Sequence, residues 1–308
     1  MIQPPLFVFA RLIAATLVSL VSLVRDESPH GTSATSRAPG ALTVTSKDGT
    51  RIAFERSGQG PVVILVSGAL STAADGAGLA ALLEPRFTVI RYDRRGRGGS
   101  GDTPPYAIER EVEDVAALID AAGGSAFLFG SSSGAVLALE AAVRLPTKVP
   151  RVVLYEPPFV VDQSRAPVPA DIVARTNALV AGGKRSDAVE LFMTAGVGLP
   201  QDIVTQMQAL PMWKSLEGLA HTLPYDMTLM DGTQSGKPLP SERWVGARSR
   251  TLVLCGGASD PWLHAGSASL ADLLPGAAHR VLEGLDHSSP STRPQAVAPV
   301  LIEFFAAE

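Results

Sequence analysis

Residues Ser125-Ala-Phe-Leu-Phe-Gly-Ser-Ser-Ser-Gly-Ala-Val-Leu-Ala-Leu-Glu-Ala141 join an apolar run, a glycine-serine turn and a run of helix-forming residues. This order predicts a buried strand, a sharp turn and a helix. The turn, residues 130–134, fits the pattern G-x-S-x-G with Ser132 at its centre. A serine there adopts a strained backbone conformation, and flanking glycines remove side chains that would collide. The flanking strand and helix distinguish this turn from an ordinary loop and predict that Ser132 is a nucleophile.

The composition predicts a globular protein with a large hydrophobic core. Of 308 residues, 46% are hydrophobic and 18% are charged, and the formal net charge is −4. This charge gives no electrostatic footprint for nucleic acid, so no nucleic-acid partner is expected. The one cysteine, Cys255, rules out an internal disulfide framework and fits no metal-ligand cluster. Because it lies in an apolar run, it is predicted to be a buried structural thiol.

Residues 1–40 are predicted to lie outside the folded domain. Arg11 precedes an uncharged run, 12–24, that resembles the apolar region of a leader and is short for a membrane span. Acidic residues follow directly and no A-x-A cleavage site is present, which favours a cytoplasmic location over export. Residues 25–40 are rich in Ser, Thr, Pro and Gly and are typical of a linker. An exported or membrane-anchored protein, with 6–24 as leader or anchor, and an extension without a part in the fold remain alternatives.

Strand and helix patterns alternate along residues 41–158 and 246–308, which are predicted to form the core domain. A hairpin is expected at 41–57, with Asp48-Gly49 at its turn. Further strands are predicted before the 130–134 turn and at 61–66, 87–92, 151–155, 250–255 and 279–282, and helices up to residue 83 and at 108–122 and 294–305. This alternation indicates an α/β fold with a mostly parallel central sheet and helices on both faces.

Residues 159–245 interrupt this alternation. Helices are predicted at 171–180, 186–195, 202–209 and 212–222, with no strand between them. An all-helical insertion after a sheet strand suggests a lid over the carboxyl edge of the sheet, where ligands bind. Five of the six methionines lie here, which suggests an adaptable apolar wall for the substrate, and ordinary packing is the alternative. The expected substrate-binding residues are Leu70 and Ser131 beside the nucleophile and Met207, Met212, Trp213 and Met227 in the insertion.

A serine hydroxyl needs a histidine base, and the base needs a carboxylate that orients it. Of the five histidines, His287 lies in the loop after the last predicted strand, at the same edge of the sheet as Ser132. Asp260 follows the strand 250–255 and lies between the serine and the histidine in chain order, which favours it as the acid. Glu156, just after the strand 151–155, is the substitute candidate. Asp286 adjoins His287 but is expected to point elsewhere.

With these residues in place, residues 41–308 resemble the α/β-hydrolase superfamily. The matching features are the turn 130–134, the loop Tyr92-Asp-Arg-Arg-Gly-Arg-Gly-Gly-Ser100, Asp260-Pro261 and Asp286-His287. The resemblance implies a Ser132–His287–Asp260 triad. It also implies that the loop 92–100 is structural, with Asp93 and the glycines shaping a turn, and not an anion site.

The resemblance also implies an oxyanion hole formed by the backbone N–H groups of Ala69 and Ser133. Many members of the superfamily carry His-Gly before the first of these donors, whereas this chain has Ser67-Gly68. A backbone donor survives this change of side chain. Support of the loop by a histidine is lost, however, and a less rigid loop is the expected consequence.

These residues predict a serine hydrolase that cleaves a small or medium-sized carboxylic ester through an acyl-enzyme, with no metal or organic cofactor. The same triad serves lactones, thioesters, amides and certain carbon–carbon bonds. Serine at the turn argues against dehalogenase and epoxide-hydrolase chemistry, which use a carboxylate nucleophile. Two rivals from other classes are a ligand receptor that does not turn over its ligand and a membrane-anchored interaction protein. The sequence does not predict the oligomeric state.

Overall fold

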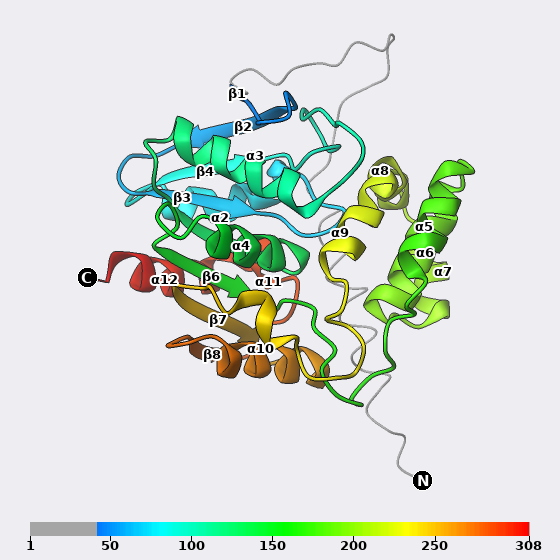
Figure 1. Ribbon diagram of the computed structural model, residues 1–308. Helices are drawn as coiled ribbons and strands as arrows, with labels where there is room; N and C mark the ends of the chain where they lie inside the picture. Colours follow the sequence, from blue (N-terminus) through cyan, green and yellow to red (C-terminus); the bar gives the residue numbers. More distant parts are fainter. Residues whose placement is uncertain (1–41, 308) are drawn as a thin grey trace.

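The computed structural model describes residues 42–307, which form one eight-stranded sheet with helices on both faces (Figure 1). The order of strands across the sheet is β1-β2-β4-β3-β5-β6-β7-β8. The strands are β1 (Leu42–Thr45), β2 (Arg51–Ser57), β3 (Val62–Val66), β4 (Thr88–Tyr92), β5 (Phe127–Ser131), β6 (Arg151–Tyr155), β7 (Arg250–Gly256) and β8 (Ala278–Leu282). Only β1 and β2 run antiparallel to their neighbours, and β3 to β8 are parallel. The predicted hairpin and the mostly parallel sheet are confirmed.

Successive residues of β3 enter two different hydrophobic cores. Ile64 and Val66 belong to the core on one face of the sheet, and Val63 and Leu65 belong to the core on the other. A strand with both faces covered needs apolar side chains at every position, which explains its continuous apolar sequence. The first core is closed by α3 (Ile108–Ala121), α4 (Ser133–Arg144) and α10 (Pro261–Leu273), and the second by α2 (Ala77–Leu83) and α12 (Pro294–Ala306).

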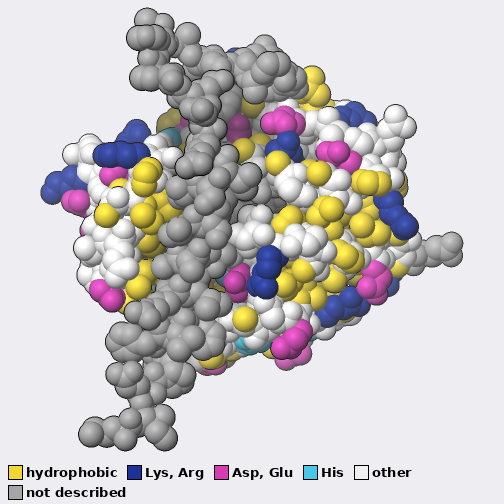
Figure 2. All heavy atoms as spheres, turned by 180° about the vertical axis from the view of Figure 1, so that it is seen from behind, with side chains coloured by type: hydrophobic (Ala, Val, Ile, Leu, Met, Phe, Trp, Pro, Cys, Tyr) yellow, Lys and Arg dark blue, Asp and Glu magenta, His cyan; other side chains and the backbone are white. Residues whose placement is uncertain are grey.

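Two short helices complete the core domain, the 3-10 helix η1 (Ala73–Gly76) and α11 (Ser289–Thr292). The rear of the molecule is seen in Figure 2, where apolar side chains lie among charged side chains of both signs. Leu82 on α2 is 39% exposed. Single exposed apolar residues of this kind are normal on protein surfaces.

Among the described residues, all the regular secondary structure of the insertion between β6 and β7 is helical. It contains α5 (Ile172–Ala181), α6 (Arg185–Leu191), the π-helical segment η2 (Phe192–Val197), α7 (Gln201–Gln208), α8 (Met212–Leu219), the 3-10 segments η3 (Ala220–Thr222) and η4 (Ser241–Trp244), and α9 (Leu223–Leu229). Its helices enclose a third hydrophobic core of their own. Figure 1 shows it as a separate layer beside one edge of the core domain, with α9 nearest the sheet.

The four helices predicted in the insertion are present with shifted ends, but α9 was not predicted. The helix predicted at 212–222 ends at Leu219, and the chain passes through one 3-10 turn before α9 starts at Leu223. Pro224 explains the break, because proline is accepted in the first turn of a helix but not in its interior. This unpredicted helix brings the insertion into contact with α3 and α4.

No helix among residues 42–307 is long and apolar enough to cross a membrane. The predictions of a leader, anchor or linker within residues 1–40 lie outside the described residues.

The turn between β5 and α4 is held by close backbone packing. A Cβ atom on Gly134 would lie closer than 3.0 Å to the carbonyl oxygens of Val66 and Ser67, a separation that Cβ atoms essentially never show. A Cβ on Gly130 would clash in the same way with the backbone of Gly134 and Ala135. Both glycines of the G-x-S-x-G pattern are therefore needed for packing, since backbone atoms cannot move aside as a flexible side chain would.

We expect Gly134→Ala to lower the free energy of unfolding by about 1–3 kcal/mol or more, because the added methyl group overpacks a backbone contact. Gly218→Ala is the matched control: it lies within α8, has no atom within 4 Å of an added Cβ, and is expected to be neutral or to stabilise by roughly 0.5–1 kcal/mol. Urea denaturation followed by circular dichroism measures both. Equal stability of the two variants would contradict the packing argument.

Candidate active site

Ser132 occupies the strained turn that its sequence predicts. Its backbone has φ 56° and ψ −130°, in the left-handed half of conformational space that non-glycine residues rarely enter. The turn is held from both sides: the Ser132 N–H donates to the carbonyl of Tyr155 at 2.9 Å, and the Ser132 carbonyl accepts from Ala135 N–H at 2.9 Å. Strain of this kind persists only where the surrounding structure fixes it. The Ser132 hydroxyl is thereby presented at the carboxyl end of β5.

His287 lies in the loop after β8 and pairs with a buried carboxylate. Its Nδ1 lies 2.7 Å from Oε2 of Glu156, and its side chain is 41% exposed, whereas the carboxylate of Glu156 is fully buried. The Tyr155 hydroxyl donates to the carbonyl of Asp286 at 2.7 Å, which ties the histidine loop to the end of β6. With Nδ1–H donated to the carboxylate, Nε2 is the ring nitrogen left free to accept a proton.

Glu156 is built into the end of β6 by its own contacts. Its φ is 46°, and its Oε1 accepts hydrogen bonds from the N–H of Gly256 at 2.6 Å and the hydroxyl of Ser259 at 2.5 Å. The buried thiol of Cys255 also points at Oε1, at 3.4 Å, in agreement with its predicted structural role. One carboxylate oxygen is thus held by β7 and the loop after it, and the other faces the imidazole.

The prediction that Asp260 is the acid that orients His287 is wrong. Asp260 lies in a carboxyl-edge loop as expected, but it directly precedes α10, and its side chain makes no hydrogen bond to a described residue. Glu156, the substitute candidate, directly follows the last residue of β6 and reaches the imidazole from there. Asp286 points elsewhere, as predicted: its Oδ1 accepts hydrogen bonds from Ser288 and Ser289.

The pair shifts the pKa values of both partners in opposite directions. Burial by itself lowers the pKa of His287, but the hydrogen bond and charge of Glu156 raise it above the ordinary value of 6.5, and the charges of Asp286 and then Asp260 add smaller contributions. Burial by itself raises the pKa of Glu156, but His287, Ser259 and Gly256 bring it below its ordinary value. Glu156 is therefore ionised at neutral pH, and the protonated imidazole is stabilised beside it.

The loop after β3 packs directly on the turn that carries Ser132. A Cβ on Gly68 would lie 3.1 Å from Cβ of Ser132 and 3.7 Å from its Oγ. Ala69 follows Gly68, and Leu70 holds a positive φ of 55°. No acceptor among the described residues is recorded for the N–H groups of Ala69 or Ser133. Ala69 and Ser133 thus adjoin, along the chain, the two residues Gly68 and Ser132 that pack on each other, and their role as oxyanion donors stays a prediction.

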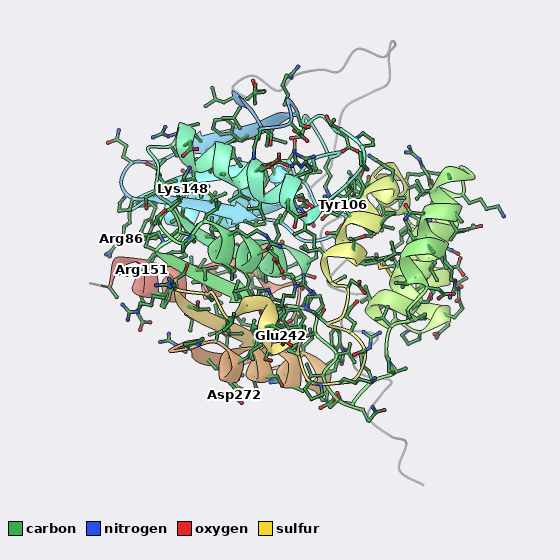
Figure 3. All side chains as sticks on the ribbon, viewed as in Figure 1. Arg86, Tyr106, Lys148, Arg151, Glu242 and Asp272 are labelled. Atoms are coloured by element: carbon green, nitrogen blue, oxygen red, sulfur yellow. The ribbon has the colours of Figure 1, made fainter. Side chains whose placement is uncertain are left out.

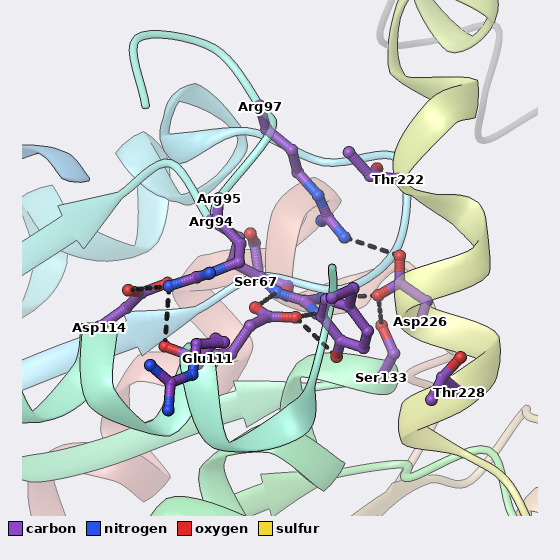
Figure 4. Close-up of polar contacts among 12 residues, drawn as sticks. Ser67, Arg94, Arg95, Arg97, Glu111, Asp114, Ser133, Thr222, Asp226 and Thr228 are labelled. Atoms are coloured by element: carbon purple, nitrogen blue, oxygen red, sulfur yellow. Dashed lines mark hydrogen bonds and ion pairs between the residues drawn. The ribbon is translucent and has the colours of Figure 1, made fainter. Parts of the chain in front are cut away.

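Two arginines of the loop after β4 support the loop after β3, which lacks the histidine that many members of the superfamily carry. Arg97 Nη1 donates to the carbonyl of Gly68 at 2.6 Å, and Arg94 Nη1 donates to the carbonyl of Ser67 at 3.3 Å. Both guanidinium groups are buried and paired with Asp226 of α9 at 2.6 Å (Figure 4). The loop after β4 is therefore structural, as predicted. Asp93 also shapes its turn, by accepting hydrogen bonds from Ala73 and Gly99.

Asp226 stays ionised in this cluster. Burial by itself raises its pKa, but the charges of Arg94 and Arg97 and the hydroxyl of Ser133 bring it below its ordinary value. Nothing in the sequence pattern singles out Asp226, since it lies on the unpredicted helix α9. The burial of this aspartate is explained only by the tertiary structure, in which two arginines pair with it.

The residues predicted to form an apolar wall for the substrate lie in different surroundings. Met207, Trp213 and Met227 are buried within the core of the insertion, where packing between helices accounts for them. The indole N–H of Trp213 donates to Ser186, also within the insertion. Ala69 and Leu70 pack against this same core, so its apolar side chains do meet the loop beside Ser132. For Leu70, and for the half-buried Ser131 and Met212, a substrate role stays a prediction.

Among residues 42–307, no group of three or more His, Cys, Asp or Glu side chains is arranged to hold a metal ion.

Comparison with known proteins agrees with this geometry. The model of the Alpha/beta hydrolase family matches residues 63–300. The crystal structure of an alpha/beta hydrolase from Sphaerobacter thermophilus DSM 20745 is similar, with 55% sequence identity and a TM-score of 0.79 over 86% of this chain and 100% of that chain. A thermophilic esterase from Thermogutta terrifontis has a TM-score of 0.62 at 19% identity, covering 87% of this chain and 98% of that one, which shows a shared fold.

A curated relative matches over a shorter segment. The uncharacterized hydrolase YraK of Bacillus subtilis (strain 168) is 34% identical over 113 residues, which are 35% of this chain and 42% of that protein. The chain thus matches less than half the length of this relative.

We expect Glu156→Gln to lower the pKa of His287, because the substitution removes the carboxylate charge that stabilises the imidazolium. Asp260→Asn is the matched control and should lower that pKa less, since Asp260 acts only through a more distant charge. Titration of the His287 ring by two-dimensional NMR measures both shifts. A larger shift in the Asp260 variant would restore Asp260 as the orienting acid.

Proposed function

The chain belongs to the alpha/beta hydrolase family, and on this premise we propose that it is a serine hydrolase that cleaves a carboxylic ester through an acyl-enzyme. One observation carries the proposal: a strained Ser132 at the carboxyl end of β5 shares its sheet edge with a histidine that is held by a buried carboxylate. A serine, a base and an orienting acid are the three groups that nucleophilic acyl transfer needs.

In the proposed first step, Nε2 of His287 takes the proton of the Ser132 hydroxyl while Oγ bonds to the ester carbonyl carbon. The carbonyl oxygen becomes an oxyanion, which the N–H groups of Ala69 and Ser133 stabilise by hydrogen bonds. The intermediate collapses, the bond to the alcohol oxygen breaks, and His287 returns its proton to the leaving alcohol. Water then attacks the acyl-serine, again losing its proton to Nε2. The second intermediate collapses, the bond between Oγ and the acyl carbon breaks, and His287 returns its proton to Oγ, which releases the carboxylic acid and restores Ser132.

Glu156 supports both steps from the other side of the ring. Its Oε2 accepts a hydrogen bond from Nδ1–H, which keeps Nε2 in the form that accepts a proton. Its negative charge stabilises the imidazolium formed in each step. Because Glu156 is buried and held by Gly256 and Ser259, little reorganisation is needed when that charge appears.

The helical insertion is proposed to act as a lid that recognises the apolar part of the substrate. Its core meets Ala69 and Leu70 beside Ser132, so an acyl or alcohol group of small or medium size would lie against apolar side chains. A serine nucleophile favours esters over epoxides or haloalkanes, for which this superfamily uses a carboxylate.

Ser132→Ala should abolish labelling by a fluorophosphonate probe and reduce kcat for p-nitrophenyl esters by at least about 10³-fold, because the nucleophile is lost. Mass spectrometry locates the adduct, and a panel of esters, lactones, thioesters and amides ranks the leaving groups. Ser131→Ala, in the adjacent serine, is the matched control and should retain labelling. A wild-type protein that neither labels nor turns over any member of the panel would instead be a ligand receptor.

The pH dependence follows from the raised pKa of His287. The imidazole must be unprotonated to act as base, so kcat/KM should fall as the pH drops through that pKa, with an inflection above the ordinary value of 6.5. Glu156→Gln should move the inflection to lower pH and reduce kcat. A pH profile that is flat from pH 5 to pH 8 in the wild-type protein would argue against His287 as the base.

A further inference from the structure

Asp226 is linked to both sides of the proposed oxyanion hole, directly on the side of Ser133 and through Arg97 on the side of Ala69. It comes from α9 of the insertion and is fully buried. Its Oδ1 accepts from the hydroxyl of Ser133 at 2.7 Å, and its Oδ2 pairs with Nη2 of Arg97 at 2.6 Å. The other terminal nitrogen of Arg97 donates to the carbonyl of Gly68 at 2.6 Å. One side chain of the insertion therefore holds Ser133 directly and the loop after β3 through one arginine. Figure 4 shows Asp226 between Ser133 and Arg97.

The contact with Gly68 has a specific consequence for Ala69. The carbonyl of Gly68 and the N–H of Ala69 belong to the same peptide unit, which is planar and, when trans, directs the two groups to opposite sides. Fixing the carbonyl on Arg97 therefore fixes the direction of the N–H, pointing it away from the arginine. The same hydrogen bond polarises the peptide and strengthens its N–H as a donor.

The cluster around Asp226 is charge-balanced and closed to water. Arg94 binds Glu111 through two hydrogen bonds, of 2.7 and 2.6 Å, and binds Asp226 through a third. The side chains of Arg94, Arg97, Glu111 and Asp226 are each at most 2% exposed. The cluster holds two positive and two negative side chains. If any one of them turned toward solvent, its partner would remain in the interior as an unpaired charge, so all four are held in place.

The insertion also reaches this cluster through an aromatic contact. Tyr106 lies between the core domain and the insertion (Figure 3) and stacks on Tyr225 of α9, with ring centroids 4.3 Å apart. Its hydroxyl donates to Glu111 at 3.0 Å. The helix that carries Asp226 is thus also linked to the core domain through Tyr106 and Glu111, and Glu111 in turn binds Arg94.

We propose that Asp226 and Arg97 are positioning residues for the oxyanion hole, so that the insertion supplies part of the catalytic support as well as a substrate wall. This inference rests on the proposed hydrolase function. Neither side chain touches the substrate. They act through the two backbone N–H groups, by fixing the Gly68–Ala69 peptide and the Ser133 side chain.

The test compares Asp226→Asn with the wild-type protein on a p-nitrophenyl ester that the wild type hydrolyses. We expect kcat to fall about 10- to 100-fold, with KM changed by less than about threefold. This loss is smaller than that caused by removing a whole oxyanion donor, which is on the order of 10²–10³-fold. A trifluoromethyl ketone forms a tetrahedral adduct with the Ser132 hydroxyl, and the former carbonyl oxygen of this adduct is the oxyanion. The affinity of the protein for this ketone should fall in parallel with kcat/KM. A purely structural role for Asp226 would not couple these two losses.

Asp114→Asn is the matched control, because Asp114 is an equally buried carboxylate that is bound twice to an arginine, Arg95, at 2.8 and 2.7 Å. Within residues 42–307, neither Asp114 nor Arg95 forms a hydrogen bond with the loop after β3. We expect the control to lose stability but to keep kcat and ketone affinity within about threefold of the wild type. An equal loss of kcat in this control would overturn the proposal.

Ser133→Ala provides a second variant should Asp226→Asn fail to fold, since it removes only the hydroxyl that Asp226 holds and keeps the N–H donor. It should show a smaller loss of kcat with the same parallel loss of ketone affinity. If the folded variants keep kcat and ketone affinity while the wild-type protein is active, the positioning role fails alone. If the wild-type protein shows no turnover and no labelling of Ser132, the hydrolase function itself fails.

Discussion

The approach of the loop after β3 to the turn after β5 is the constraint on which the rest of the structure depends. Gly134 and Gly68 let two backbone segments touch where any side chain would separate them. Ser132 holds its positive φ at this contact, and Ala69 directly follows Gly68 there. The hydroxyl, the two proposed oxyanion donors and the start of α4 all lie at or next to one tight backbone fit, which the surrounding parallel strands make rigid.

Buried ion pairs support this contact, because apolar side chains cannot donate hydrogen bonds to its backbone carbonyl groups. Carbonyl groups at the end of a strand need hydrogen-bond donors, and Arg94 and Arg97 supply them to Ser67 and Gly68. Two buried arginines in turn need carboxylates, which come from Glu111 of α3 and Asp226 of the insertion. An ionic cluster thus supports this loop, and its desolvation cost is offset only while all its partners are present.

The choice between two candidate acids shows how tertiary position decides a role. Asp260 and Glu156 both follow a strand at the carboxyl edge of the sheet, and Asp260 also has the expected chain order. Glu156 orients the imidazole because it follows β6 at once and because Gly256 and Ser259 of the neighbouring strand and loop hold one of its oxygens. Asp260 lies beyond β7, ahead of α10, where only its charge reaches His287.

The sequence by itself determined the parallel sheet, the turn at Ser132, the histidine and the helical insertion, because hydrophobic periodicity and small residues in a tight turn are local signals. The resemblance to the superfamily also implied Ala69 and Ser133 as oxyanion donors, and this role stays a prediction. Only the tertiary structure decided that Glu156 holds His287, that Met207, Trp213 and Met227 pack among helices, and that Asp226 braces the loop after β3. These outcomes depend on which strand ends and helices meet, and the pairing of charges 130 or so positions apart leaves no pattern along the chain.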